Sequence, residues 1–468
     1  MRRRMVRSWK LAIPLGVLLA IGAAIAATTA TASRSAGVIK IGIMTDCKGA
    51  FGGAYEEDIA GAQAAFAKYA GARPKDPKKP SAGLVGGSMG GKSIKIVGYG
   101  CGDETPSLAL KETRRLVEQL GADVLIGPLS GDEGVAIANY AKTKQPGKTF
   151  INGTSGGQQT TLKVRAPNFF RYNGDGAQWN AGTGEIAYKR LHWRKAAIFM
   201  DDYSFGYTSG AGFIADFCSW GGQITKRVFA PSPNQDYSSY VQQLPPPDKV
   251  DGYFWVIGGS GTGPSLKAYT QLYGKVDPKK FIGNLFFAFE GNDAEIGPQV
   301  VGAYMGGFGT GPGLKTPLAN AYRAASNHWY KPYMDGAKLS VDDGFYYNYW
   351  NAAWALVKGM NAAHGNLSGG QKKLQAAMPR VLNAGFGKIV LDRNRQAIQD
   401  QYPIQYTKLP DGSISFDVIG VVRQVTQKFG GYFSETTPSP SRAAPTCHKA
   451  NLPWHNKIVP VVNGVPKG

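Results

Sequence analysis

The chain has 468 residues and a formal net charge of +21, and 43% of its residues are hydrophobic and 11% aromatic. This length and composition allow two or three domains with substantial cores and exclude a largely disordered chain. The basic residues are scattered rather than clustered, so the charge favours attraction to anionic surfaces or ligands and argues against a nucleic-acid-binding protein.

Residues 1–32 have the organisation of a secretory signal peptide. A basic start is followed by an apolar stretch from about Leu11 to Ala27 and by an A-x-A cleavage site that ends at Ala32. We expect cleavage after Ala32, and no Cys precedes Cys47, so no thiol at that site could carry a lipid. The mature protein would be periplasmic, with its charge reduced to +16 by the loss of five basic residues. An uncleaved membrane anchor is the alternative, because the apolar stretch is near the short end of a spanning helix.

Strand-type and helix-type segments alternate through two series after the signal peptide. Such alternation predicts βαβ units and parallel sheets covered by helices on both faces, with ligands bound at the ends of the strands. In the first series, strands at 38–46, 94–100, 123–130 and 148–153 alternate with helices at 55–70, 106–121 and 133–143. In the second series, strands at 195–202, 223–230, 251–259 and 280–287 alternate with helices that end near Tyr188, Trp220, Leu244 and Tyr273.

The remainder of the chain is first helical and then strand-rich. Helical patterns cover 317–330 and 341–364, and 388–422 has the character of β-hairpins. Residues 436–445, TTPSPSRAAP, have the composition of a linker, and the tail beyond them has no periodicity that predicts an element.

GGSMGGKS at residues 86–93 matches the phosphate-binding pattern G-x-x-x-x-G-K-[ST]. That chemistry needs a strand before the glycines and a helix after the Lys-Ser pair. Here a stretch rich in Pro and Gly precedes Gly86, and the β-type run IKIVGYG follows Ser93. We therefore expect a glycine-rich turn that leads into a strand, with Lys92 in solvent, rather than a nucleotide site.

The four cysteines of an exported chain predict two disulfides, for which three connectivities are possible. Cys47 and Cys101 each follow the end of a predicted parallel strand, so neighbouring strands would place them at the same edge. We favour that pair, which leaves Cys218 with Cys447. No metal or other cofactor is expected, because the cysteines lack close C-x-x-C spacing and the five histidines are dispersed.

The segments, in this order, resemble the leucine/isoleucine/valine-binding family of type I periplasmic binding proteins, the solute receptors of ABC importers. Matching stretches include IKIGIMTDCKGAFGGAYEEDIAGAQAAF, GGKSIKIVGYG, DVLIGPLSGDEGVAIANYA, INGTSGG and KAAIFMDDYSFGYTSGAGF, and the similarity covers nearly all of residues 38–430. The resemblance implies an α/β fold of two Rossmann-like, doubly wound parallel-sheet lobes, joined by a three-crossover hinge and closing on a ligand. Lobe 1 would comprise 38–171 and 308–390, lobe 2 would comprise 172–307 and 391–430, and 431–468 would form a linker and tail.

In this family, loops of lobe 1 hold a ligand carboxylate through N–H groups and hydroxyls. Gly131 stands where serine is common in the family, so only its backbone N–H remains as a donor. Asp132 has an alternative role as a cap of the following helix. The matching positions are Ser130, Gly131 and Asp132 in one loop and Thr154, Ser155 and Gly156 in the next.

Further residues match the walls of the family's ligand pocket, and aromatic walls are common in ligand clefts. Each of these aromatic residues has an alternative role in the hydrophobic core. The matching positions are Phe51 and Tyr55 after the first strand, Tyr203, Phe205 and Ser260 in lobe 2, and Phe345 in the helical return.

The sequence leaves open whether the ligand carries an amine. A buried ammonium group needs a facing carboxylate, and Glu290 is the candidate for that role. Otherwise the neighbouring Phe286, Phe287 and Phe289 indicate an apolar or aromatic ligand without an amine.

The resemblance implies a non-catalytic receptor that binds a hydrophobic amino acid, or a related small carboxylate or amide, and delivers it to the membrane permease of an ABC importer. We expect a monomer without nucleic-acid partners. A ligand-sensing lobe of a signalling receptor is the alternative, since the same closure serves both roles. A remote alternative is a serine hydrolase, because GTSGG at 153–157 matches G-x-S-x-G with Ser155 as nucleophile. The helix that this motif needs is poorly predicted, and the candidate bases His192, His328 and His364 have no supporting context.

Overall fold

The computed structural model describes residues 37–283, 297–410 and 414–467. The predicted signal peptide, Glu290 and the three phenylalanines beside it lie outside the described residues. None of the helices in these ranges is both long and apolar enough to cross a membrane.

The first series of predicted strands forms a six-stranded sheet in the order β4-β5-β1-β6-β7-β8. Its neighbouring strands are parallel, except for the antiparallel pair β4 and β5. β1 is buried from Ile41 to its end, which is typical of a central strand with helices on both faces. The strands are β4 (Ser88–Met89), β5 (Lys92–Gly102), β1 (Val38–Asp46), β6 (Val124–Ile126), β7 (Thr149–Ile151) and β8 (Phe169–Phe170).

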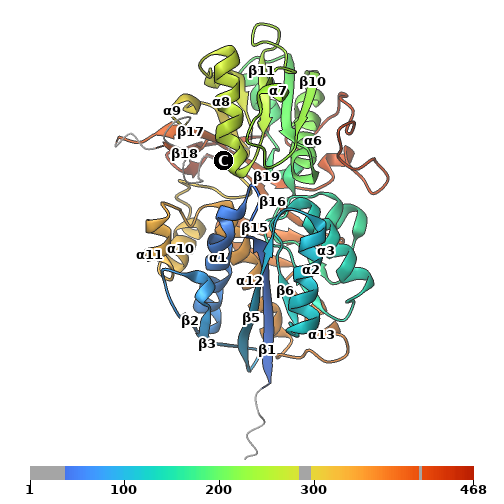
Figure 1. Ribbon diagram of the computed structural model, residues 1–468, viewed down its shortest axis with the longest axis vertical. Helices are drawn as coiled ribbons and strands as arrows, with labels where there is room; N and C mark the ends of the chain where they lie inside the picture. Colours follow the sequence, from blue (N-terminus) through green and yellow to red (C-terminus); the bar gives the residue numbers. More distant parts are fainter. Residues whose placement is uncertain (1–36, 284–296, 411–413, 468) are drawn as a thin grey trace, which may run out of the picture. The chain divides into compact units, whose positions relative to one another are not determined.

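Two pairs of helices pack beside this sheet, α1 with α12 and α2 with α3 (Figure 1). α1 has three acidic residues in its first turn, a composition typical of the start of a helix. It ends at Ala70 and is capped by Gly71, whose φ of 71° is the left-handed conformation that glycine tolerates best. The helices of this part are α1 (Tyr55–Ala70), α2 (Pro106–Arg114), α3 (Gly131–Thr143), α10 (Pro317–Ser326), α11 (Lys331–Gly336), α12 (Gly344–Ala362) and α13 (Lys372–Ala377).

Within the glycine-rich motif at 86–93, Gly90 and Gly91 form the turn between β4 and β5, which agrees with the predicted turn that leads into a strand. β5 begins at Lys92 and continues to Gly102, so a strand stands where a phosphate-binding loop would need a helix. The motif therefore lacks the helix N-terminus on which phosphate binding depends.

The second series forms a seven-stranded sheet in the order β10-β9-β11-β12-β13-β17-β18. The first five strands of this order are parallel, and β17 and β18 complete it as an antiparallel hairpin. The strands are β10 (Gln223–Ala230), β9 (Lys195–Asp201), β11 (Gly252–Val256), β12 (Phe281–Ile282), β13 (Tyr304–Met305), β17 (Ile404–Lys408) and β18 (Ile414–Val418). The helices of this part include α4 (Gly176–Trp179), α5 (Thr183–Glu185), α6 (Ser204–Ser219), α7 (Ser238–Val241), α8 (Thr262–Tyr273) and α9 (Gly297–Val300).

A third sheet, in the order β14-β15-β16-β19-β20-β21, is antiparallel throughout. It contains β-hairpin strands that the sequence predicts and also two strands of the C-terminal tail, for which the sequence predicts no element. We call the first sheet with its helices lobe 1 and the second sheet with its helices lobe 2. The strands of the third sheet are β14 (Val381–Ala384), β15 (Gly387–Leu391), β16 (Ala397–Gln401), β19 (Gly420–Val425), β20 (Val459–Val462) and β21 (Val465–Pro466).

Both favoured disulfides are present in the structure, Cys47–Cys101 and Cys218–Cys447. The first joins the carboxyl ends of β1 and β5, which are neighbours in the first sheet. The second joins α6 to the C-terminal tail across a sequence separation of 229 residues.

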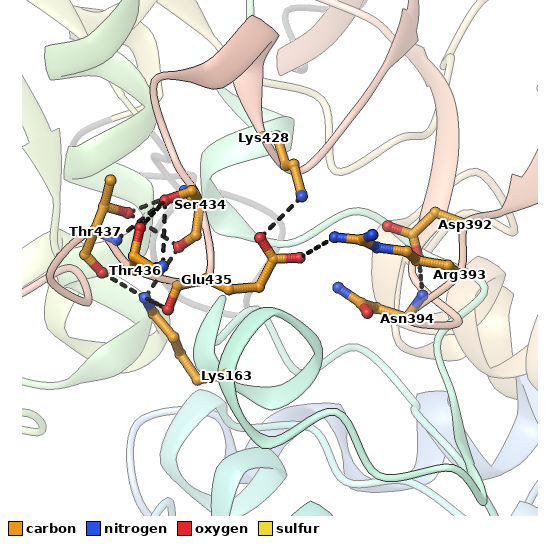
Figure 2. Close-up of polar contacts among 9 residues, drawn as sticks. All are labelled: Lys163, Asp392, Arg393, Asn394, Lys428, Ser434, Glu435, Thr436 and Thr437. Atoms are coloured by element: carbon orange, nitrogen blue, oxygen red, sulfur yellow. Dashed lines mark hydrogen bonds and ion pairs between the residues drawn. The ribbon is translucent and has the colours of Figure 1, made fainter.

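The tail begins in a network of charged and backbone groups (Figure 2). Lys163, in the helical turn Thr160–Val164, donates hydrogen bonds to the backbone carbonyls of Ser434 at 3.0 Å and Glu435 at 2.9 Å, and also to that of Thr437. The Glu435 carboxylate forms ion pairs with Arg393 at 2.8 Å and Lys428 at 2.9 Å. The contacts with Lys163 and Arg393 hold the start of the tail against segments that are distant in sequence.

Further along, the tail is packed against lobe 2. Leu452 and Trp454 are buried in an apolar cluster with residues of α4, α6 and β19. The Trp454 indole N–H donates to Asp216 at 3.2 Å, and the His455 ring stacks on Trp220 with ring centroids 4.0 Å apart. The tail is thus an integral layer of this fold.

Candidate functional site

A small cavity, about 20 Å³ in volume, lies between loops that follow the carboxyl ends of parallel strands in both lobes. This edge is where open α/β sheets bind ligands. Loops after β1, β6 and β7 contribute from lobe 1, and the start of α6 after β9 contributes from lobe 2. The lining residues are Phe51, Leu129, Ser130, Gly131, Thr154, Gly156, Trp179, Tyr203, Phe205, Phe308 and Phe345.

Most of the predicted site residues are brought together around this cavity. Those that line it are Phe51, Ser130, Gly131, Thr154, Gly156, Tyr203, Phe205 and Phe345.

Four predicted residues do not line the cavity. Tyr55 is the first residue of α1 and is partly buried. The Ser155 hydroxyl is packed against Gly134 of α3, where an added Cβ would lie 2.0 Å from Oγ. Asp132 accepts a hydrogen bond from the Ser204 N–H at 3.3 Å, and Ser260 donates its backbone N–H to the Ala50 carbonyl at 2.9 Å.

Two hydroxyls of the lobe 1 loops are the polar groups of most interest. Ser130 is 2% exposed and Thr154 is 2% exposed, and neither side-chain oxygen has a hydrogen-bond partner among the described residues. Ser130 occupies the N-cap position of α3 but makes no side-chain cap bond. A buried polar group without a partner costs about 1–3 kcal/mol, so a ligand oxygen at this point would relieve a penalty.

Tyr203 supplies a third buried hydroxyl, from the lobe 2 side. Its oxygen also has no hydrogen-bond partner among the described residues. Burial, and then the negative charges of Glu104 and Asp201, hold the pKa of this phenol well above its usual value. Tyr203 therefore keeps its proton and is available as a donor.

Aromatic rings form the rest of the wall. Phe51 lies edge-on to Phe205 across the two lobes, with ring centroids 5.8 Å apart, and 5.9 Å from Phe345. Trp179 and Phe308 lie 4.5 Å apart by the same measure. Such rings present flat apolar surfaces and positive edges, which suit a planar ligand.

Three lining residues are absent from the sequence-based predictions: Leu129, Trp179 and Phe308. Trp179 ends α4, whose capping box of Asp175 and Gln178 is a recognisable helix start. Nothing in that local pattern directs the indole toward a loop more than twenty residues earlier. Its place depends on Gly156, where an added Cβ would lie 2.7 Å from the indole ring.

A cluster of buried carboxyl groups lies beside the loop that carries Phe51. Burial raises the pKa of Glu104 to about 8 and that of Glu133 to about 7, and burial also raises the pKa of Asp46 well above its usual value. Glu104 accepts the Phe51 backbone N–H at 3.0 Å. The cluster thus supports the loop from beneath, and Glu104 largely keeps its proton near neutral pH.

The hydrolase alternative finds no catalytic arrangement at Ser155. The Ser155 hydroxyl is fully buried and has no hydrogen-bond partner among the described residues. The candidate bases His192, His328 and His364 are all exposed. A nucleophile needs a base within hydrogen-bond reach, and none of these histidines supplies one.

The geometry is that of a ligand cleft between two α/β lobes, and residues 38–412 match a family model described as periplasmic binding protein. The chain belongs to the periplasmic binding protein family. A search of curated protein sequences finds no significant match.

Solved structures of ABC transporter solute-binding proteins have the same fold as this periplasmic binding protein. One from R. palustris in complex with benzoate is 21% identical, with a TM-score of 0.66 over 83% of this chain and 98% of that one. One from Rhodopseudomonas palustris BisB5 in complex with 3,4-dihydroxybenzoic acid is 18% identical, with a TM-score of 0.67 over 83% and 98%. A leucine-binding protein from Thermotoga maritima is 19% identical, with a TM-score of 0.63 over 82% and 99%.

Proposed function

We propose that this protein is the extracytoplasmic solute receptor of an ABC importer and that its ligand is a small aromatic carboxylate without an amine. The carboxylate would lie against the loops at 129–131 and 154–156, and the ring would lie among Phe51, Phe205 and Phe345. The protein would act without catalysis, and its ligand-bound form would be recognised by the importer's permease.

The observation that carries this proposal is the pair of unpartnered hydroxyls, Ser130 Oγ and Thr154 Oγ1, in a cavity walled by aromatic rings. A carboxylate has two oxygens that accept several hydrogen bonds, so one anion could satisfy both hydroxyls. Neutral hydroxyls and backbone N–H groups bind an anion without the desolvation cost of a buried cation.

The charge of the lining favours an acid over an amino acid. None of the described residues that line the cavity is Asp, Glu, Lys or Arg. A buried ammonium group would therefore lack a carboxylate partner within this described lining. The benzoate and dihydroxybenzoate complexes of the R. palustris proteins support the same choice, whereas the Thermotoga maritima protein represents the amino-acid alternative.

Thermal unfolding with a panel of ligands tests the proposal. The purified protein is heated with benzoate, 4-hydroxybenzoate, benzamide, phenylalanine and leucine in one buffer. A ligand at about a hundred times its Kd adds roughly 2.7 kcal/mol, a shift of several degrees for domains of this size. We expect the two acids to stabilise the protein, and stabilisation by the amino acids alone would contradict the proposal.

A matched pair of serine variants locates the ligand. Ser130→Ala removes a buried hydroxyl of the cavity, and we expect benzoate affinity to fall by about tenfold. Ser239→Ala, in α7, changes an exposed side chain outside the cavity and should leave affinity unchanged. Equal effects of the two substitutions would place the ligand elsewhere.

The family is extracytoplasmic, and the signal peptide is part of the same proposal. The mass of the exported protein checks it directly. We expect a chain that begins at Ser33, and a retained N-terminus would support the membrane-anchored alternative.

A further inference from the structure

Beside the cavity, hydrogen bonds that involve no ligand join the two lobes. Asp132 of α3, in lobe 1, accepts the backbone N–H of Ser204 at the start of α6 in lobe 2, at 3.3 Å. The Ala50 carbonyl, in the lobe 1 loop after β1, accepts the backbone N–H of Ser260 at 2.9 Å. Asp132 and Ser260 match ligand-contact positions of the family, and in the structure both make contacts from lobe to lobe.

The first hydrogen bond caps the N-terminus of α6, which has no side-chain cap from its own N-cap residue. The first N–H groups of any helix have no partner within the helix. The N-cap residue of α6 is Tyr203, and its side chain makes no cap bond. The Asp132 carboxylate supplies both an acceptor and a negative charge at this helix N-terminus, and each favours the helix. Opening of the cleft would take this cap away.

The second bond depends on a close approach of two backbones. Gly259, next to Ser260, has a φ of 54°, and a Cβ added there would lie 2.1 Å from the Ala50 carbonyl oxygen. No side chain larger than hydrogen can occupy this position while the lobes are in contact. Glycine is thus required by the contact between lobes as well as by the local turn.

We propose that Asp132 and the Gly259–Ser260 turn form a closure latch, with Asp132 as a positioning residue that caps α6 from the opposite lobe. The latch acts between lobes, so it stabilises the closed form in the absence of ligand as well as in its presence. This inference rests on the proposed receptor function, because it names the contacts by which the receptor's lobes close. It also implies that the two bonds form and break together, since each requires the same movement of lobe against lobe.

Hydrogen exchange in the ligand-free protein tests this coupling. We compare amide exchange at Ser204 and at Ser260 in the wild type, in Asp132→Ala and in Gly259→Ala. Asp132→Ala should speed exchange at Ser260, which Asp132 does not contact in the described structure, by about tenfold or more. Gly259→Ala should do the same at Ser204. Exchange that changes only at the residue next to each substitution would overturn the latch.

Three control variants separate the latch from a local structural effect. Gly71→Ala also places a side chain at positive φ, at 71°, with nothing within 4 Å of the added Cβ. Thr316→Ala removes a cap within lobe 1, where Thr316 accepts the Ala319 N–H at 3.2 Å. Both should leave exchange at Ser204 and Ser260 unchanged. Asp132→Asn keeps an acceptor oxygen and should restore most of the protection at Ser260.

Measurements of benzoate binding and dissociation distinguish failure of the latch from failure of the proposed function. If benzoate binds the wild type, its dissociation should be about tenfold faster from Asp132→Ala than from Thr316→Ala. If none of the aromatic acids binds but the exchange coupling is present, the latch stands and the proposed ligand class fails. If an acid binds but exchange at the two sites is uncoupled, the receptor stands and the latch fails.

Discussion

At the scale of single residues, the buried hydroxyl of Thr154 is the clearest test of the proposed carboxylate site. The hydroxyl is buried without a partner among the described residues, so its polar group weakens the ligand-free fold. We expect Thr154→Val, which keeps the shape, to leave the free energy of unfolding unchanged or to raise it by about 1 kcal/mol. Benzoate affinity should fall by about tenfold in the same variant. Urea unfolding and calorimetric titration measure the two effects, and a loss of stability with unchanged affinity would contradict this role.

Glu104 makes stability depend on pH, because burial raises its pKa from 4.5 to about 8. Between these values the folded protein keeps the proton while the unfolded chain has released it. The free energy of unfolding should therefore fall as pH rises from about 4.5 to about 8. Glu133, with its pKa raised to about 7, contributes with the same sign over a narrower range.

Glu104→Gln removes one of these titrations and keeps an acceptor for the Phe51 N–H. We expect a shallower loss of stability between pH 5 and pH 8, measured as the urea midpoint at several pH values. The matched control is Glu112→Gln, because the Glu112 carboxylate is paired with Arg115 nearer the surface. A slope that is the same in Glu104→Gln as in the wild type would show that Glu104 does not hold its proton.

At the scale of elements, the pairing of α1 with α12 depends on one small residue. A Cβ added at Gly61 of α1 would lie 2.2 Å from the Tyr346 carbonyl oxygen of α12. Gly61→Ala should destabilise the protein by about 1–3 kcal/mol, since the helices would have to move apart. Gly336→Ala, at the end of α11 with nothing within 4 Å of the added Cβ, is the control and should be nearly neutral. Equal urea midpoints for the two variants would contradict this packing argument.

The local patterns predict elements well where pattern and burial agree. The segments VIKIGIMTD and IKIVGYG form β1 and most of β5, as their patterns predict. A short apolar run between turn residues has few other stable conformations. The tail is the opposite case. β20 and β21 contain Val and Pro without a clear period, and β20 becomes a strand by pairing with β19. Such a strand is specified by its partner rather than by its own residues.

At the scale of the whole molecule, the tail and its disulfide tie distant parts of the chain together. The Cys218–Cys447 link spans 229 residues, so its loss would free a long loop in the unfolded chain. We expect replacement of both cysteines by Ser to lower the free energy of unfolding by about 2–5 kcal/mol. The buried Leu452 and Trp454 should keep the tail associated at low urea. Unfolding curves of oxidised wild type and variant measure the loss, and identical curves would show that packing alone holds the tail.

Much of this protein follows from its sequence alone: the alternation of strands and helices, both disulfides, and the loops that carry Ser130 and Thr154. The alternation and the Cys47–Cys101 pair are local features, because they depend on periodicity, on breakers and on the ends of neighbouring parallel strands. The Cys218–Cys447 pair followed by elimination, and the two loops followed from the resemblance to the family. The tertiary structure alone decided which residues share the cavity, because Trp179 and Phe308 reach it from segments far along the chain. It also brought Asp132 within hydrogen-bond distance of the Ser204 N–H, across 72 residues of sequence. The chemical type of a side chain limits which groups it can bind, but the packing of the two lobes determines which group lies within its reach.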